Sequence, residues 1–88
     1  MKRRERMWTH VTALPTPLTA EGRAHQVAIE GLQRGDGTWA GRIVFTDGSR
    51  VRRTGQETSQ PNRAALEYWA SGLEKVYLEG AFQRSQQD

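Results

Sequence analysis

Cysteine is absent from this 88-residue chain, and histidine occurs only twice, as His10 and His25. Without cysteine there can be no disulfide framework and no thiolate metal site, and the absence suits the reducing cytoplasm in which we expect the protein. The two histidines are not spaced as metal ligands. No pattern supplies Ser49 or Ser59 with a base that would make it a nucleophile. We therefore expect no metal, no cofactor and no enzymatic activity.

Long hydrophobic runs are also missing. None approaches the roughly 20 apolar residues of a membrane helix, and no apolar secretion signal follows the basic start. We therefore expect no membrane partner. Hydrophobic residues make up 35% of the chain and the mean hydropathy is −0.80, which is polar for a globular domain. A chain of this length is expected to form one domain, with part of it in tails or loops.

Acidic residues are outnumbered by basic ones. Thirteen lysines and arginines stand against ten aspartates and glutamates, which gives a formal charge of +3 and a pI near 10. Eleven of the thirteen cations are arginine, whose guanidinium group matches phosphate and carboxylate geometry. Arginine bias also follows from genome composition, so this charge allows contact with nucleic acid without requiring it.

The first 24 residues are predicted to be a basic tail and loop. Residues 1–6, Met-Lys-Arg-Arg-Glu-Arg, form either a solvated tail or an arm that contacts nucleic acid, and Met7 is an alternative start. Residues 7–14 alternate in the manner of an edge strand, although the sequence leaves open whether they join the sheet. The prolines within 15–17 end this pattern. Residues 18–24 are predicted to be a loop.

Residues 25–84 are predicted to form an α+β domain with the order β-β-β-α. Its three strands, separated by Gly-Asp-Gly and Asp-Gly turns, span 25–34, 38–46 and 49–55. One helix is predicted over 62–85, because apolar residues recur there at three-and-four spacing. It begins after hydroxyl residues and a proline that suit a helix start. The predicted architecture is two layers, an antiparallel three-stranded sheet on one helix with 7–14 as a potential fourth strand, and a disordered end at 85–88.

The buried face of this sheet depends on the turn around Asp47. A three-residue loop, Thr46-Asp47-Gly48, with Gly48 in the left-handed region pairs Ile43 with Val51. This register buries four apolar side chains on the helix side: Trp39, Ile43, Phe45 and Val51. It places Arg42, Arg50 and Arg52 together on the open face.

Asp47 follows a strand as the first metal-binding carboxylate of ribonuclease H-type nucleases does. Such chemistry needs several carboxylates around two metal ions. The predicted helix carries Ala65 where that family would have a glutamate, and no later acidic strand follows. Asp47 is therefore interpreted as a turn residue.

Two segments within residues 27–79 resemble the HicB-type antitoxins. One is Asp-Gly-Thr-Trp-Ala-Gly at 36–41, and the other is the helix segment 64–79 with its seven-residue step from Ala65-Leu66 to Gly72-Leu73. The resemblance implies a β-β-β-α domain that works through protein contacts. The sequence departs from the family in lacking its Leu-Pro-Gly segment and a DNA-binding segment after residue 80. A stand-alone domain of that shape is therefore expected rather than a toxin-neutralising antitoxin.

Two candidate surfaces follow from these predictions. The first is the basic sheet face, Arg42, Arg50 and Arg52 with Arg34, which is a phosphate-binding surface, a surface for an acidic protein, or a solvated face with Glu30 as countercharge. The second is an apolar helix patch that would contact a protein partner or a second copy: Tyr68, Tyr77 and Phe82. A regulatory protein-interaction module, dimeric because a small sheet leaves open edges, is the favoured function. Nucleic-acid binding by the basic face and the 1–6 arm is the alternative.

Overall fold

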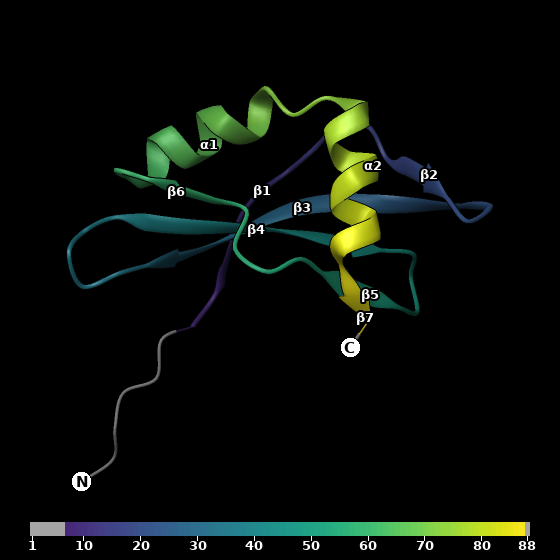
Figure 1. The fold of residues 1–88 in the computed structure, drawn as a ribbon, viewed down its shortest axis with the longest axis horizontal. Helices are drawn as coiled ribbons and strands as arrows, with labels where there is room; N and C mark the ends of the chain where they lie inside the picture. The colour runs from purple at the N-terminus through teal and green to yellow at the C-terminus, as the bar shows by residue number, and fades with distance from the viewer. Residues whose placement is uncertain (1–6, 88) are drawn as a thin grey trace, which may run out of the picture.

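The computed structural model describes residues 7–87, and these form a compact α+β domain with two helices on an antiparallel sheet (Figure 1). The strands within the described residues are β1 (Thr9–Ala13), β2 (Leu18–Ala20), β3 (Arg23–Gln33), β4 (Trp39–Thr46), β5 (Val51–Arg53), β6 (Thr58–Gln60) and β7 (Gln86–Gln87). The helices are α1 (Arg63–Ser71) and α2 (Lys75–Arg84). The predicted class is therefore correct, but the described part of the chain has seven strands where three or four were predicted.

The long β3–β4 hairpin is the centre of the sheet, and shorter strands flank it on both sides. β1 and β2 pair with successive parts of β3, while β6 and β5 pair with successive parts of β4, and β7 adds to β5. The edge strand expected at 7–14 is thus present as β1. The proposed arm at 1–6 lies outside the described residues.

Residues 18–24, predicted to be a loop, instead form a second hairpin. β2 turns into β3 through Glu21 and Gly22, which have φ angles of 56° and 75°. Positive φ at both central residues matches the right-handed twist of a tight hairpin, and glycine adopts it without steric cost. The two-residue turn therefore returns the chain directly from Ala20 to Arg23.

The register predicted around Asp47 is wrong. Thr46 pairs with Val51 and Phe45 with Arg52, so the loop has four residues, 47–50. The Asp47 side chain sets this length, because its Oδ1 accepts hydrogen bonds from the amides of Ser49 (3.2 Å) and Arg50 (2.9 Å). Gly48 does adopt a positive φ of 98°. Val51 leaves the predicted apolar face, and Arg52 joins the face that carries Phe45.

The predicted single helix is broken at Gly72–Glu74. Asn62 begins α1 by accepting a hydrogen bond from the Ala65 amide (2.8 Å), and Gly72 ends it. The residues expected to cap the helix, 58–60, form β6 instead. After the break α1 contacts β1 and β6 while α2 contacts β2, so the two short helices cover different ends of the sheet (Figure 1).

Both helices pack on the same face of the β3–β4 hairpin. Leu66, Ala70, Leu78, Ala81 and Phe82 from the helices meet apolar strand residues in one continuous core. The strand side of this core is Val11, Leu18, Val27, Ile29, Ile43 and Phe45. No helix among the described residues is long and apolar enough to cross a membrane.

Candidate binding groove

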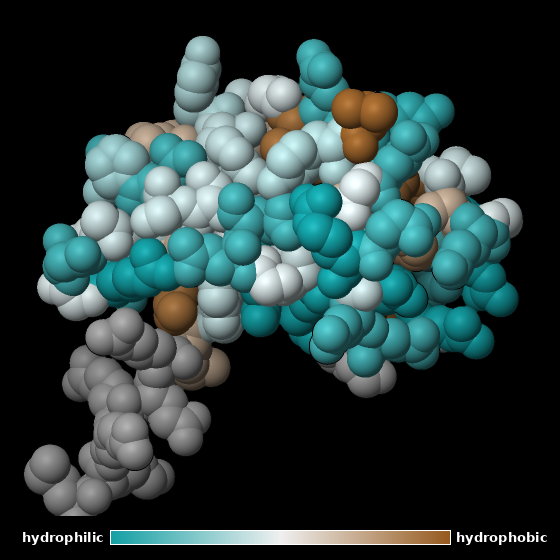
Figure 2. Space-filling model, in the orientation of Figure 1, coloured by the Kyte–Doolittle hydropathy of each residue, from teal (hydrophilic) through white to brown (hydrophobic). Residues whose placement is uncertain are grey.

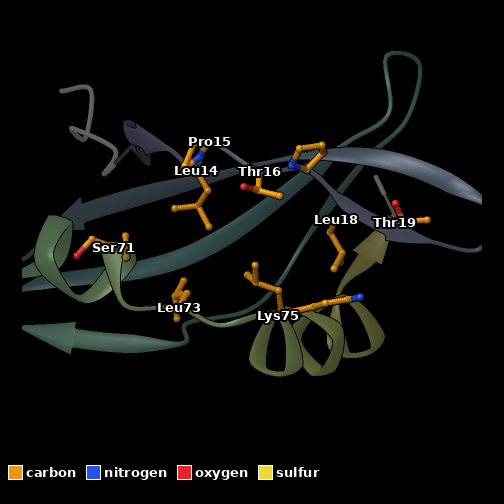
Figure 3. A pocket seen from close by; sticks show the side chains of 11 residues that line it. Leu14, Pro15, Thr16, Leu18, Thr19, Ser71, Leu73 and Lys75 are labelled. Atoms are coloured by element: carbon orange, nitrogen blue, oxygen red, sulfur yellow. The ribbon is translucent and has the colours of Figure 1, made fainter.

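An apolar groove of about 570 Å³ lies between the β1–β2 connection and the junction of the two helices (Figure 3). In Figure 3 Leu14 and Leu18 extend from the connection toward the side of the groove formed by Leu73 and Lys75. The residues that line it are Leu14, Pro15, Thr16, Pro17, Leu18, Thr19, Ala70, Ser71, Leu73, Lys75 and Leu78. Its volume lies within the range of small-ligand and peptide pockets, roughly 300–1,000 Å³.

The first wall of the groove forms because the edge of the sheet is interrupted. The Leu14 amide donates to the Val27 carbonyl (2.9 Å), which is the last bond that joins this wall to the β1 side of β3. Pro15 and Pro17 have no amide hydrogen and cannot continue the ladder. The chain resumes pairing at Leu18, which is buried at the floor of the groove, while 15–17 stay exposed.

The second wall forms because α1 stops at Ser71. The Ser71 hydroxyl donates to the Tyr68 carbonyl (2.7 Å), and the Gly72 amide donates to the Trp69 carbonyl (3.2 Å). These bonds close the last turn of α1 and direct Leu73 back onto the core, where it is half-buried. The change of backbone direction at Gly72 separates the two helices and opens the space beside them.

The charge inside the groove is positive. Lys75, the first residue of α2, is the one charged residue among those that line it. Glu74 precedes it as the N-cap, but its side chain makes no capping hydrogen bond and lines the neighbouring hollow. The first amides of a helix lack intrahelical partners and favour negative charge. One end of an otherwise apolar groove therefore favours an anionic group.

The predicted arginine face is not one surface. Arg42 lies on the helix-free face, where its Nε donates to Glu30 Oε1 (2.8 Å) and its guanidinium stacks over Trp8 at 4.3 Å. Arg50 lies in the 47–50 loop. Arg34 lies at the β3–β4 turn and donates to Ser59 (3.2 Å) and to Gln56.

Arg52 is on the helix side of the sheet, in contrast to its predicted place beside Arg42. Its Nε and Nη2 donate to the hydroxyl (2.8 Å) and carbonyl (2.9 Å) of Ser85, and its guanidinium lies 4.6 Å from the Phe82 ring centroid. The residue that does share the open face with Arg42 is Arg53, which also approaches Glu30 (3.8 Å). The four-residue loop causes this exchange, because it shifts the register of β5.

The three residues of the predicted partner interface are also separated. Tyr68 is 82% exposed, whereas Phe82 is 1% exposed and packs in the core against Phe45. Tyr77 is half-buried and donates from its hydroxyl to Glu57 (2.6 Å). Phe82 is buried because the break at Gly72 turns α2, so this residue faces the sheet rather than solvent. Val76, on α2, is 74% exposed. The face shown in Figure 2 is mostly hydrophilic, with small hydrophobic areas between its polar residues.

Glu57 fixes α2 to the segment between β5 and β6. Its carboxylate accepts hydrogen bonds from Tyr77 and from Arg84 Nη2 (2.7 Å). Burial raises the pKa of Glu57, but the hydrogen bonds from Arg84 and Tyr77 and the charge of Arg84 outweigh it and hold the pKa below its ordinary value of 4.5. Folding thus favours the ionised carboxylate.

Because this pKa is lowered on folding, the stability that Glu57 contributes is complete above its ordinary pKa and is lost as the pH falls through its folded value. We expect Glu57→Gln to lower the free energy of unfolding by about 1 kcal/mol at neutral pH, since Arg84 is half exposed. The difference from the wild type should therefore be smaller at about pH 3 than at neutral pH. Urea unfolding of both proteins at the two pH values measures it; an equal difference at both would contradict the role of the charge.

Neither the groove nor the Glu57 contacts were predicted from the sequence. The groove lies between two segments that are more than 50 residues apart in the chain. The features of the sequence that mark these segments are only the Pro-Thr-Pro interruption and Gly72. Within residues 7–87 no group of three or more histidines and carboxylates is placed to hold a metal ion. No family model matches the chain, and no curated protein and no solved structure shows significant similarity to it.

Proposed function

We propose that the protein is a non-enzymatic interaction module whose groove binds a short apolar segment of a partner protein. The groove itself is the observation that carries this proposal. It combines two exposed prolines and half-buried leucines with a single cation, a surface that water solvates poorly. The resemblance to HicB-type antitoxins, which implies a domain that works through protein contacts, is a second reason to propose this class of function.

The proposed occupant is an extended peptide with apolar side chains next to an acidic residue. The leucines and prolines favour apolar side chains, and Lys75 at the start of α2 favours a carboxylate beside them. A basic chain with charge +3 attracts an acidic segment over longer distances as well. A second copy of this chain is a weaker candidate for the groove, because two copies would bring their Lys75 charges to the same surface.

Selection from a displayed library of random heptapeptides tests the proposal while leaving the identity of the partner open. We expect enrichment of peptides with two or more large apolar residues adjacent to aspartate or glutamate. A fluorescently labelled peptide from the selection should then bind the Thr16→Trp variant at least about tenfold more weakly than the wild type. The tryptophan side chain fills the groove from an exposed position. Val76→Trp makes a similar addition outside the groove and should bind as the wild type does.

A substitution of Lys75 tests whether the charge in the groove selects an acidic peptide. Lys75→Glu should weaken binding of the acidic peptide and improve binding of its lysine counterpart. Absence of any enriched motif, or equal loss in both tryptophan variants, would contradict the groove as the binding surface. Light scattering that shows a dimer dissociated by Thr16→Trp would instead assign the groove to self-association.

Nucleic-acid binding is kept as the second candidate because of one feature, the stacking of Arg42 on Trp8 on the helix-free face. Arg53 lies on the same face, and Glu30 is the carboxylate that both approach. An aromatic ring beside cations on an open sheet is typical of single-strand binding. This function predicts affinity for single-stranded RNA or DNA that falls steeply with salt and is lost in Arg42→Ala with Arg53→Ala. No binding at low salt would exclude it.

A further inference from the structure

A small polar cavity of about 30 Å³ lies at the other end of the sheet, beside the β2–β3 turn and the 47–50 loop. Charged and polar side chains line it: Glu21, Arg23, His25, Asp47, Arg50, Arg52 and Gln87. Its volume is close to that of one water molecule or one oxygen atom of a larger ligand. It shares no lining residue with the apolar groove, so the inference drawn from it is independent of the proposed function.

His25 is the buried member of this cluster. Only 4% of the residue is exposed, its ring packs on Phe82 at a centroid distance of 4.8 Å, and its Nδ1 atom is buried without a hydrogen-bond partner. A buried polar atom is costly to leave unpaired, so such atoms are nearly always satisfied by a protein group, water or a ligand. His25 also lines the cavity, which places its ring among the charged side chains of the cluster.

The charged groups around His25 favour a negative partner. The Asp47 carboxylate is already occupied, because it accepts from two loop amides and from Arg23 Nη1 (3.3 Å). These bonds, led by the amides of Arg50 and Ser49, hold the pKa of Asp47 below its ordinary value. Glu21 is the other carboxylate and is exposed.

The cations of the cluster retain unused donors. Arg52 binds Ser85 through Nε and Nη2, which leaves Nη1, and the Arg50 side chain makes no hydrogen bond or ion pair with the described residues. Three arginines and two carboxylates therefore line the cavity, and one of these carboxylates, Asp47, already accepts three hydrogen bonds. Guanidinium groups bind oxyanions through several hydrogen bonds at once.

We propose that this cavity binds a small tetrahedral oxyanion, such as phosphate or sulfate, with one oxygen next to His25 Nδ1 and the others toward Arg50 and Arg52. The His25 ring would donate from Nδ1 to the bound oxygen. The same chemistry would accept free phosphate or the phosphate group of a phosphorylated side chain. Inorganic phosphate, sulfate and O-phosphoserine, used as separate probes, distinguish these sources.

The test is thermal unfolding of the full chain as sodium phosphate replaces sodium chloride at constant ionic strength and pH. A single site should raise the Tm by roughly 5–10 °C when phosphate reaches about ten times its Kd. Arg50→Gln should remove most of this rise, because the exposed Arg50 side chain has no other hydrogen-bond or ion-pair partner among the described residues. Arg63→Gln, an exposed arginine on α1 outside the cavity, should leave it unchanged.

Long-range ¹H–¹⁵N spectra of the two histidines locate the anion directly. Phosphate should shift the Nδ1 signal of His25 and leave His10, on the exposed edge strand, as an internal reference. Equal Tm rises in wild type and Arg50→Gln, or equal shifts of both histidines, would overturn the site. An unchanged His25 signal would show that the anion does not bind beside this ring and would also overturn the site. A response to O-phosphoserine but not to phosphate would assign the site to phosphorylated partners.

Discussion

Replacing Leu66 by alanine is expected to lower the free energy of unfolding by about 2–5 kcal/mol. Leu66 is fully buried and packs from α1 against the sheet at Gly31 and Gly41. It fits there because Gly31 and Gly41, paired across β3 and β4, leave a hollow under the helix. A Cβ at Gly41 would lie 2.5 Å from Leu66 Cδ1, so a larger residue fits only if the Leu66 side chain or α1 shifts. Urea denaturation measures the loss.

A double-mutant cycle tests whether the hollow and Leu66 form one unit. Gly41→Ala alone should destabilise by about 1–3 kcal/mol, because the added methyl group overpacks the contact. In the Leu66→Ala background the same change should cost at least about 0.5 kcal/mol less, since the clashing atom is gone. Additive effects of the two substitutions would contradict the proposed fit. The outcome also bears on the groove, because α1 carries Ala70 and Ser71 of its wall.

Phe82→Ala is expected to cost about 3–5 kcal/mol, while Tyr68→Ala changes stability by less than about 0.5 kcal/mol. Both residues were predicted to form one exposed interface. Phe82 instead contacts His25, Phe45 and Arg52, whereas Tyr68 projects from α1 into solvent.

Thermal or urea unfolding of the two variants measures this difference between two aromatic residues, one buried and one exposed. Comparable losses would mean that α2 is turned differently from the arrangement described. Tyr68→Ala also serves as a binding control, because Tyr68 is exposed beside the groove without lining it. It should bind the selected peptide as tightly as the wild type.

The central hairpin was predictable because its signals are local. Alternating apolar residues define β3 and β4, and the turn between them is held by Asp36, whose carboxylate accepts from the Thr38 amide (2.9 Å) and hydroxyl (2.7 Å). Proline at 15 and 17 likewise marked the end of the first strand. Patterns of this kind depend only on residues that are neighbours in the chain.

The β4–β5 register was not predictable from side-chain hydrophobicity. The prediction assumed that arginines avoid the apolar face, and it therefore selected a three-residue loop. In the structure Arg52 lies on that face because its guanidinium donates hydrogen bonds to Ser85 and packs on the Phe82 ring. These partners come about 30 residues later in the chain. A long-range hydrogen-bond partner removes the penalty on which the register argument relied.

The helix break was hidden by continuous periodicity. Apolar residues keep helical spacing through Leu73 and Tyr77, as they would in one helix, and only Gly72 marks the change. The break lets α1 contact β6 at one end of the sheet and α2 contact β2 at the other. The groove depends on this break and on an interruption in a distant strand, so no local pattern could reveal it.

Amide chemical shifts recorded while the selected acidic-apolar peptide is titrated into ¹⁵N-labelled protein test the central claim most directly. If the peptide binds in the groove, the largest shifts should fall on its two walls, residues 14–19 and residues 70–78, the second of which includes Lys75. The helix-free face around Arg42 should change little. Largest shifts on that face, or along β1, with the groove signals unmoved would contradict the account and place the binding surface elsewhere.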